Sequence, residues 1–138
     1  FNGDTAAANA LDDYEEGTWT PPNGAVNGIT YVLTSHEGCV YTKIGNTVFL
    51  SGEITYGATN ADNNPTYIGG LPFAPTATTG NFIGKCHTYN IAISPSVVIQ
   101  DGQNYIRLKK TFDTWDYVRR TETRYQSFIF SIAYQTAS

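Results

Sequence analysis

The sequence predicts an all-β domain, an antiparallel β-sandwich or jelly-roll, and three observations lead to this prediction. Roughly eight short segments are rich in β-branched and aromatic residues and end at Gly, Pro, Asn or Asp. No segment shows the 3.6-residue apolar spacing of an amphipathic helix, and no internal repeat is visible. Only 14% of the residues are charged, so the surface is expected to consist mainly of neutral polar side chains.

The length of 138 residues corresponds to one domain. Residues 1–10 (FNGDTAAANA) are small and polar and are expected to be a linker or the end of a stalk, followed by a β-sandwich domain over residues 11–138. No apolar run approaches the ~18 residues of a membrane span, so no membrane insertion is expected. The low content of basic residues argues against a nucleic-acid partner.

Cys39 and Cys86 lie too far apart in the chain for a CxxC metal or redox pair. Both are expected to be reduced, half-buried strand residues, because a free cysteine behaves as a small hydrophobe. A single long-range disulfide between them stays open as the alternative.

The first strands are predicted in the segment that begins at residue 29. Residues 29–34 (ITYVLT) form a strand that ends at a polar corner, 35–38 (SHEG). Residues 39–44 and 47–56 form a hairpin with a two-residue Gly-Asn loop, because Gly supplies the positive φ of a primed turn. In the second of these strands one face is predicted to be core and the other half wet and available as an interface. The core face carries Val48, Leu50, Ile54 and Tyr56, and the other carries Phe49, Ser51, Glu53 and Thr55.

The second half of the chain contains further short strands. A strand that starts at Tyr67 ends at a corner stiffened by Pro72 and Pro75. Asp101 and Gly102 mark a turn. The last segment alternates strictly between apolar and outward positions. The predicted strands are 82–93, 97–100, 105–112 and 128–134, and the segment 113–126 is interpreted as either a strand or a long loop.

Residues 11–21 (LDDYEEGTWTP) place four carboxylates within five residues. Catalytic carboxylates need different environments, whereas these adjacent acids would share one solvated environment, and no histidine or nucleophile lies nearby. Calcium ligands would be spaced around a loop. The stretch is therefore predicted to be the domain entry: the acids stay in water, Gly17 turns the chain, and Trp19 with Pro21 and Pro22 pins the first extended segment against the sheet.

Four motifs resemble a known family when they are taken in order. They are LDDYEEGTWTP (11–21), YTKIGN (41–46), GLPF (70–73) and the closing FSIAYQTAS (130–138). Together they are similar to a recurrent C-terminal domain of tailed-bacteriophage tail fibre and tailspike proteins. The resemblance implies a compact homotrimeric β-domain on the virion, at the distal, extracellular end of a fibre, attached to an upstream fibre stalk.

The charges are unevenly distributed along the chain. Residues 1–42 hold six acids and no Lys or Arg, and residues 107–124 hold six of the eight basic residues. One interpretation is two solvated faces. The other is that the acids at 12–16 of one copy approach the basic residues of a neighbouring copy in the trimer.

Three function classes follow from the resemblance. The first is recognition of a host surface polysaccharide or other receptor, the second is a trimerisation and stabilising cap, and the least favoured is a glycan-degrading enzyme; no cofactor, metal or catalytic residue is expected. Sugars stack on aromatic rings and pair their hydroxyls with planar polar groups. Residues 80–126 hold such side chains and none of the four family motifs, although Trp115 and Tyr117 have a core position as the alternative. The candidate ligand-binding residues are His87, Tyr89, Asp113, Trp115, Asp116, Tyr117 and Arg119.

Overall fold

The structure is a computed structural model that describes residues 14–22, 24–26, 29–57, 67–76, 80–89, 95–100, 102–109 and 126–137. These residues form antiparallel β-strands and turns and contain no helix, so the prediction of an antiparallel all-β fold is confirmed. The strands are β1 (Tyr14–Thr18), β2 (Gly24–Val26), β3 (Ile29–Ile44), β4 (Thr47–Gly57), β5 (Tyr67–Gly69), β6 (Asn81–Tyr89), β7 (Ser96–Gln100), β8 (Tyr105–Lys109) and β9 (Gln126–Gln135).

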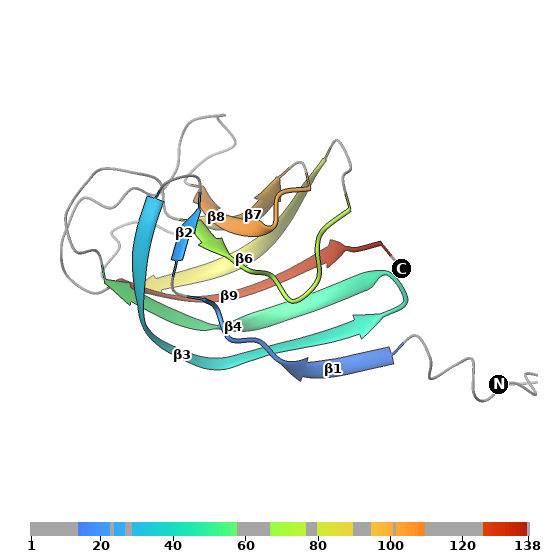
Figure 1. Ribbon diagram of the computed structural model, residues 1–138, viewed down its shortest axis with the longest axis horizontal. Coiled ribbons are helices and arrows are strands. Elements are labelled where there is room, and N and C mark those ends of the chain that lie inside the picture. Colours follow the sequence, from blue (N-terminus) through green and yellow to red (C-terminus); the bar gives the residue numbers. More distant parts are fainter. Residues whose placement is uncertain are drawn as a thin grey trace, which may run out of the picture.

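The strands join into one curled sheet in the order β1-β3-β4-β9-β6-β7-β8-β5, and β2 pairs with β3 (Figure 1). The sheet bends at β6, which changes its partner along its length. Residues 85–89 pair with β9, whereas residues 81–84 pair with β7. A Cβ atom at Gly84 would lie 2.2 Å from the Ser131 carbonyl oxygen, so the backbones approach too closely for a side chain at the bend.

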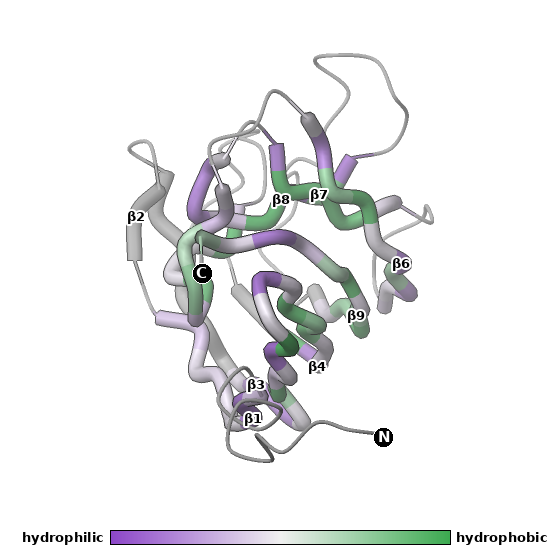
Figure 2. Tube along the Cα trace, turned by 90° about the vertical axis from the view of Figure 1, so that its right-hand side faces the viewer, coloured by the Kyte–Doolittle hydropathy of each residue, from purple (hydrophilic) through white to green (hydrophobic). Residues whose placement is uncertain are grey.

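The core lies on the inner side of the curled sheet, where β7 and β8 turn back over β4 and β9 (Figure 2). The alternation predicted for residues 128–134 is confirmed, since the even-numbered side chains are buried and the odd-numbered ones are exposed. The core face predicted for Val48, Leu50 and Ile54 is also confirmed, because all three are buried. The buried cluster comprises Trp19, Cys39, Val48, Leu50, Ile54, Ile68, Leu71, Val97, Ile99, Ile106, Leu108, Phe128, Phe130, Ile132 and Tyr134.

The predicted hairpin between β3 and β4 is confirmed. Gly45 has φ +58°, and Ile44 lies directly opposite Thr47 across the two-residue loop. A primed turn needs positive φ at this position, which Gly adopts without a steric penalty.

The polar corner predicted at residues 35–38 is wrong. The chain continues through it as part of β3, whose pairing with β4 shifts between Leu33 and Ser35 and again between Glu37 and Val40. Gly38, at the second shift, has φ +56°. A β-bulge accommodates the extra residue there, so a Gly that resembled a turn signal instead bends a continuous strand.

The turns in the second half of the chain follow the prediction. Gly70 (φ +66°) ends β5 ahead of the two prolines, and Gly102 (φ +68°) lies between β7 and β8. The Gln103 amide donates to the Gln100 carbonyl at 3.0 Å and closes the latter turn. The strands β6 to β9 lie within or close to the predicted ranges, whereas residues 90–94 and 110–125 are outside the described part of the chain.

Trp19 fixes the entry segment to the sheet, as predicted. Its backbone amide donates to the Cys39 carbonyl at 2.9 Å, and its indole Nε1 donates to the Gly70 carbonyl at 2.7 Å. The ring is 4% exposed and packs edge-on against Phe130, with centroids 6.2 Å apart. The turn predicted at Gly17 is wrong, because Gly17 is an extended residue of β1 whose missing side chain leaves room for the Tyr41 ring.

Replacing Gly45 by Val is expected to lower the free energy of unfolding by about 1–3 kcal/mol. Apart from its two chain neighbours, no described residue has an atom within 4 Å of a Cβ at this position, so the cost is expected to come from the backbone conformation. Urea denaturation should show a lower midpoint with an unchanged slope. Gly45→Asn is the matched control, because Asn tolerates the left-handed region better. A Val variant as stable as the parent would show that this turn conformation is wrong.

Trp19→Phe is expected to destabilise the fold by about 1–3 kcal/mol, since it leaves the Gly70 carbonyl without its indole donor. The melting temperature should fall, while the exposed control Tyr14→Phe should melt as the parent does. An unchanged melting temperature for Trp19→Phe would contradict the anchoring role of this residue.

Candidate functional site

The strands β1, β3, β4 and β9 and the second half of β6 present a second face on the side opposite the core. Residues that lie directly opposite one another in antiparallel strands share a face, so the register defines its members. This outer face carries Tyr14, Glu16, Glu37, Val40, Thr42, Ile44, Thr47, Phe49, Ser51, Glu53, Thr55, Lys85, His87, Tyr89, Ser127, Ile129, Ser131 and Ala133.

Large apolar side chains are concentrated on the outer face. The exposed large hydrophobic residues in the described part of the chain are Tyr14, Val40, Ile44, Phe49, Ile83, Tyr89 and Ile129. All of these except Ile83 belong to the outer face. Phe49 is 50% exposed near the start of β4, at a solvent-facing strand position that normally carries a polar residue. Several large exposed apolar side chains on one face are typical of an interaction site.

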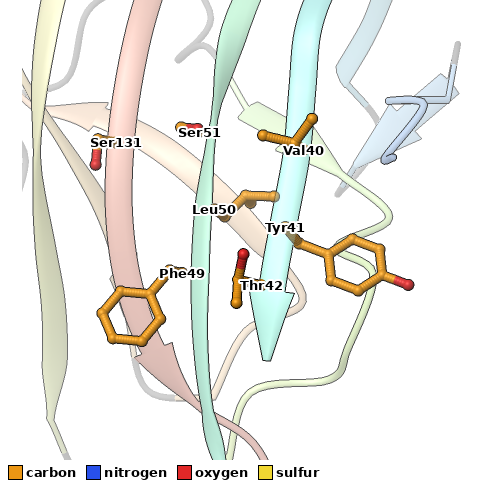
Figure 3. Close-up of a pocket in the computed structure, with 7 residues that line it drawn as sticks. All are labelled: Val40, Tyr41, Thr42, Phe49, Leu50, Ser51 and Ser131. Atoms are coloured by element: carbon orange, nitrogen blue, oxygen red, sulfur yellow. The ribbon is translucent and has the colours of Figure 1, made fainter. Parts of the chain in front are cut away.

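A shallow depression of about 120 Å³ opens on the outer face between β3, β4 and β9 (Figure 3). Val40 and Phe49 supply its apolar sides, and the hydroxyls of Thr42, Ser51 and Ser131 lie around it. Its volume is well below the ~300–1,000 Å³ of small-molecule pockets. The depression can therefore accept one inserted side chain, and a larger ligand would lie across the face.

The charged groups of the outer face are separated by sign. Glu37 on β3 and Glu53 on β4 are cross-strand neighbours, an arrangement in which like charges repel. The Ser127 hydroxyl donates to Glu53 Oε1 at 3.2 Å. Lys85 and His87 lie on β6, on the far side of β9. One side of the outer face is thus acidic and the other carries the cationic group.

His87 and Tyr89 lie together on β6, as predicted. Both side chains are exposed, and their rings meet edge to face with centroids 5.3 Å apart. Ser127 lies directly opposite Tyr89 on β9 and supplies a hydroxyl beside the pair. The other five candidate ligand-binding residues lie outside the described residues and stay a prediction: Asp113, Trp115, Asp116, Tyr117 and Arg119.

The exposed apolar residues Val40, Phe49 and Ile129 were not among the predicted site residues. The signal for Phe49 was present, because the alternation of residues 47–56 already placed it on the non-core face. Val40 was hidden by the bulge at Gly38, which changes the relation between sequence position and face.

Arg107 belongs to a separate cluster on β8. Its guanidinium lies 5.0 Å from the Tyr67 ring centroid and 4.9 Å from that of Tyr105. It donates to Gln100 Oε1 at 2.9 Å and to the Tyr105 hydroxyl at 2.5 Å. These contacts join β5, β7 and β8, so the cluster stabilises this end of the sheet.

The two cysteines are free and lie in strands, Cys39 buried on β3 and Cys86 half-buried on β6. Burial raises the pKa of both thiols, that of Cys86 to about 11. Both are therefore protonated and unreactive at neutral pH. In the part of the chain that the structure covers, no three His, Cys, Asp or Glu side chains are grouped so that they could hold a metal ion.

The described part of the acidic stretch forms hydrogen bonds within the chain. The Tyr41 hydroxyl donates to Glu15 Oε1 at 2.8 Å, and the Tyr14 hydroxyl donates to Glu16 Oε2 at 2.5 Å. Each bond to a carboxylate raises the pKa of its tyrosine. Both carboxylates are exposed, as predicted, whereas Asp12 and Asp13 lie outside the described residues.

Comparisons with protein-family models, curated proteins and solved structures gave no match for this chain. The family resemblance is therefore carried by the four sequence motifs alone. Among the residues that the structure places, no helix has the length and hydropathy to cross a membrane.

Glu15→Gln is expected to lower the pKa of Tyr41 towards its ordinary value, because the amide still accepts the hydrogen bond but no longer opposes the phenolate charge. NMR titration of tyrosines labelled at Cζ measures this shift. Glu16→Gln should act on Tyr14 and leave Tyr41 unchanged. An unaltered Tyr41 titration in Glu15→Gln would rule out the contact between β1 and β3.

Proposed function

We propose that this domain is the trimeric tip of a bacteriophage tail fibre or tailspike and that it recognises a glycan on the host surface without degrading it. The observation that carries the proposal is the exposed His87–Tyr89 pair beside the hydroxyl-lined outer face. Aromatic rings provide surfaces for the CH patches of sugars, and hydroxyls and carboxylates provide partners for sugar hydroxyls. The β-sandwich or jelly-roll description and the virion location belong to this proposal.

The pair has the mechanical support that a recognition site needs. Residues 85–89 of β6 pair with β9, which is itself paired with β4, so the strand that carries both rings is held within the sheet. Two short aromatic side chains on a rigid strand lose little conformational freedom when a ligand binds. The predicted residues between 113 and 119 would add to the contact.

A second candidate function is a trimerisation cap that stabilises the fibre and leaves recognition to another domain. The exposed apolar residues Val40, Phe49 and Ile129 favour it, because large apolar side chains exposed on one face are typical of subunit contacts. A glycan-degrading activity is the least favoured. Glu37 and Glu53 are neighbours on an open sheet face, whereas paired catalytic carboxylates act in different environments around an enclosed sugar.

Tyr89→Ala is expected to weaken glycan binding by about 30-fold, the usual effect of removing an aromatic anchor. Tyr89 is 50% exposed, so the variant should keep the parent melting temperature. An array of bacterial surface polysaccharides measures the binding. The matched control is Tyr14→Ala, because Tyr14 is 45% exposed at the opposite edge of the same face.

Two results would contradict this assignment. If a folded Tyr89→Ala variant binds as the parent does, the His87–Tyr89 pair is not the contact. If the parent chain binds no polysaccharide while it forms trimers, the cap function replaces recognition.

A further inference from the structure

We infer that the outer face around Phe49 is the surface on which a second copy of this chain docks, with the acidic side of one copy against the Lys85 side of the next. The inference rests on the trimer of the proposed function and names the surface that forms it. It uses Val40, Phe49, Glu37, Glu53 and Lys85, and it leaves the His87–Tyr89 pair at the margin of the contact.

The shape of the surface fits a protein partner. The middle of the outer face is lined by small side chains, with Ser51, Ser131 and Ala133 on β4 and β9. Small residues let another chain approach closely, while Phe49 and Val40 project beside them. The depression between them has room for one side chain of the neighbouring copy.

The two sides of the outer face carry opposite charges, so the acidic side of one copy can pair with the Lys85 side of another. Glu37 and Glu53 repel each other across β3 and β4, and Lys85 lies two strands away from Glu53, so it is not a cross-strand neighbour of either acid. A cyclic arrangement places the left side of each copy against the right side of the next. Lys85 of one copy then approaches the two carboxylates of another and offsets their repulsion.

The size of the surface predicts how strong the contact is. Five strands spaced by ~4.8 Å and about nine residues of ~3.3 Å rise give an area on the order of 700 Å². In a cyclic trimer each copy divides this area between two neighbours, so each contact is well below the ~800 Å² per partner of a standard interface. We therefore expect isolated chains to associate weakly and chains held by a shared stalk to associate fully, because a short linker supplies an effective concentration of about 1 mM.

Sedimentation equilibrium of the 138-residue chain, at concentrations up to about 1 mM, tests the surface. Phe49→Asp is expected to weaken self-association by at least about 30-fold. Ile83→Asp is the matched control: Ile83 is 46% exposed on the same strand as Lys85, but it lies on the part that pairs with β7. It should associate as the parent does.

A charge exchange tests the orientation of the contact. Glu53→Lys and Lys85→Glu alone should each weaken association about 5–10-fold at low salt, and the double variant should return to within about 2-fold of the parent. A monomeric parent at the highest concentration, or association that persists in Phe49→Asp, overturns the inference. Parent dimers that are lost in Phe49→Asp would support this surface and refute the trimer. Glycan binding is measured separately on Tyr89→Ala, so the two proposals can fail independently.

Discussion

The change of partner along β6 is the constraint on which the rest of the structure depends. Because residues 81–84 pair with β7 and residues 85–89 pair with β9, one strand belongs to both ends of the curled sheet. The bend brings Val97 and Ile99 over Phe130 and Ile132, which closes the core. The close approach at Gly84 makes the bend sterically feasible, since a side chain there would collide with β9.

The same bend separates two kinds of surface. Inward positions of β4 and β9 are completed by the returning strands β7 and β8, whereas the outward positions of the same strands have no such cover within the described residues. Trp19 closes the remaining side of the core by joining the entry segment to the carbonyls of Cys39 and Gly70. The buried cluster is apolar, whereas the outer face mixes polar side chains with a few large apolar ones that no described strand covers.

The elements with strong local signals were predictable from the sequence. The alternation of residues 128–134 and the Gly-Asn loop depend on backbone geometry and on the 2-residue period of a strand, and both were confirmed. The Gly residues at 17 and 38 were misread as turns, because a Gly that admits a neighbouring ring or a bulge has the same local sequence as a Gly that turns the chain.

The site was predictable only in part. His87 and Tyr89 share a face because they are two residues apart on one strand. This spacing can be read directly from the sequence. The neighbours of Phe49 could not be found in this way. That it lines one depression with Val40 and Ser131 depends on the pairing of strands far apart in the chain, and cross-strand register has no local signature at a bulge.

The position of β9 has a consequence for the biosynthesis of the protein. This strand is the last of the described strands in chain order, yet it lies between β4 and β6 and joins the two ends of the sheet. Until residues 126–135 leave the ribosome, β4 has a neighbour on one side only, and its Val48, Leu50 and Ile54 cannot be covered by Phe128 and Tyr134. Until then a nascent chain exposes the unpaired edge of β4, and contacts of such long range form slowly. Folding of this domain must therefore wait until β9 has emerged from the ribosome, and before that point unfinished copies can pair wrongly through β4.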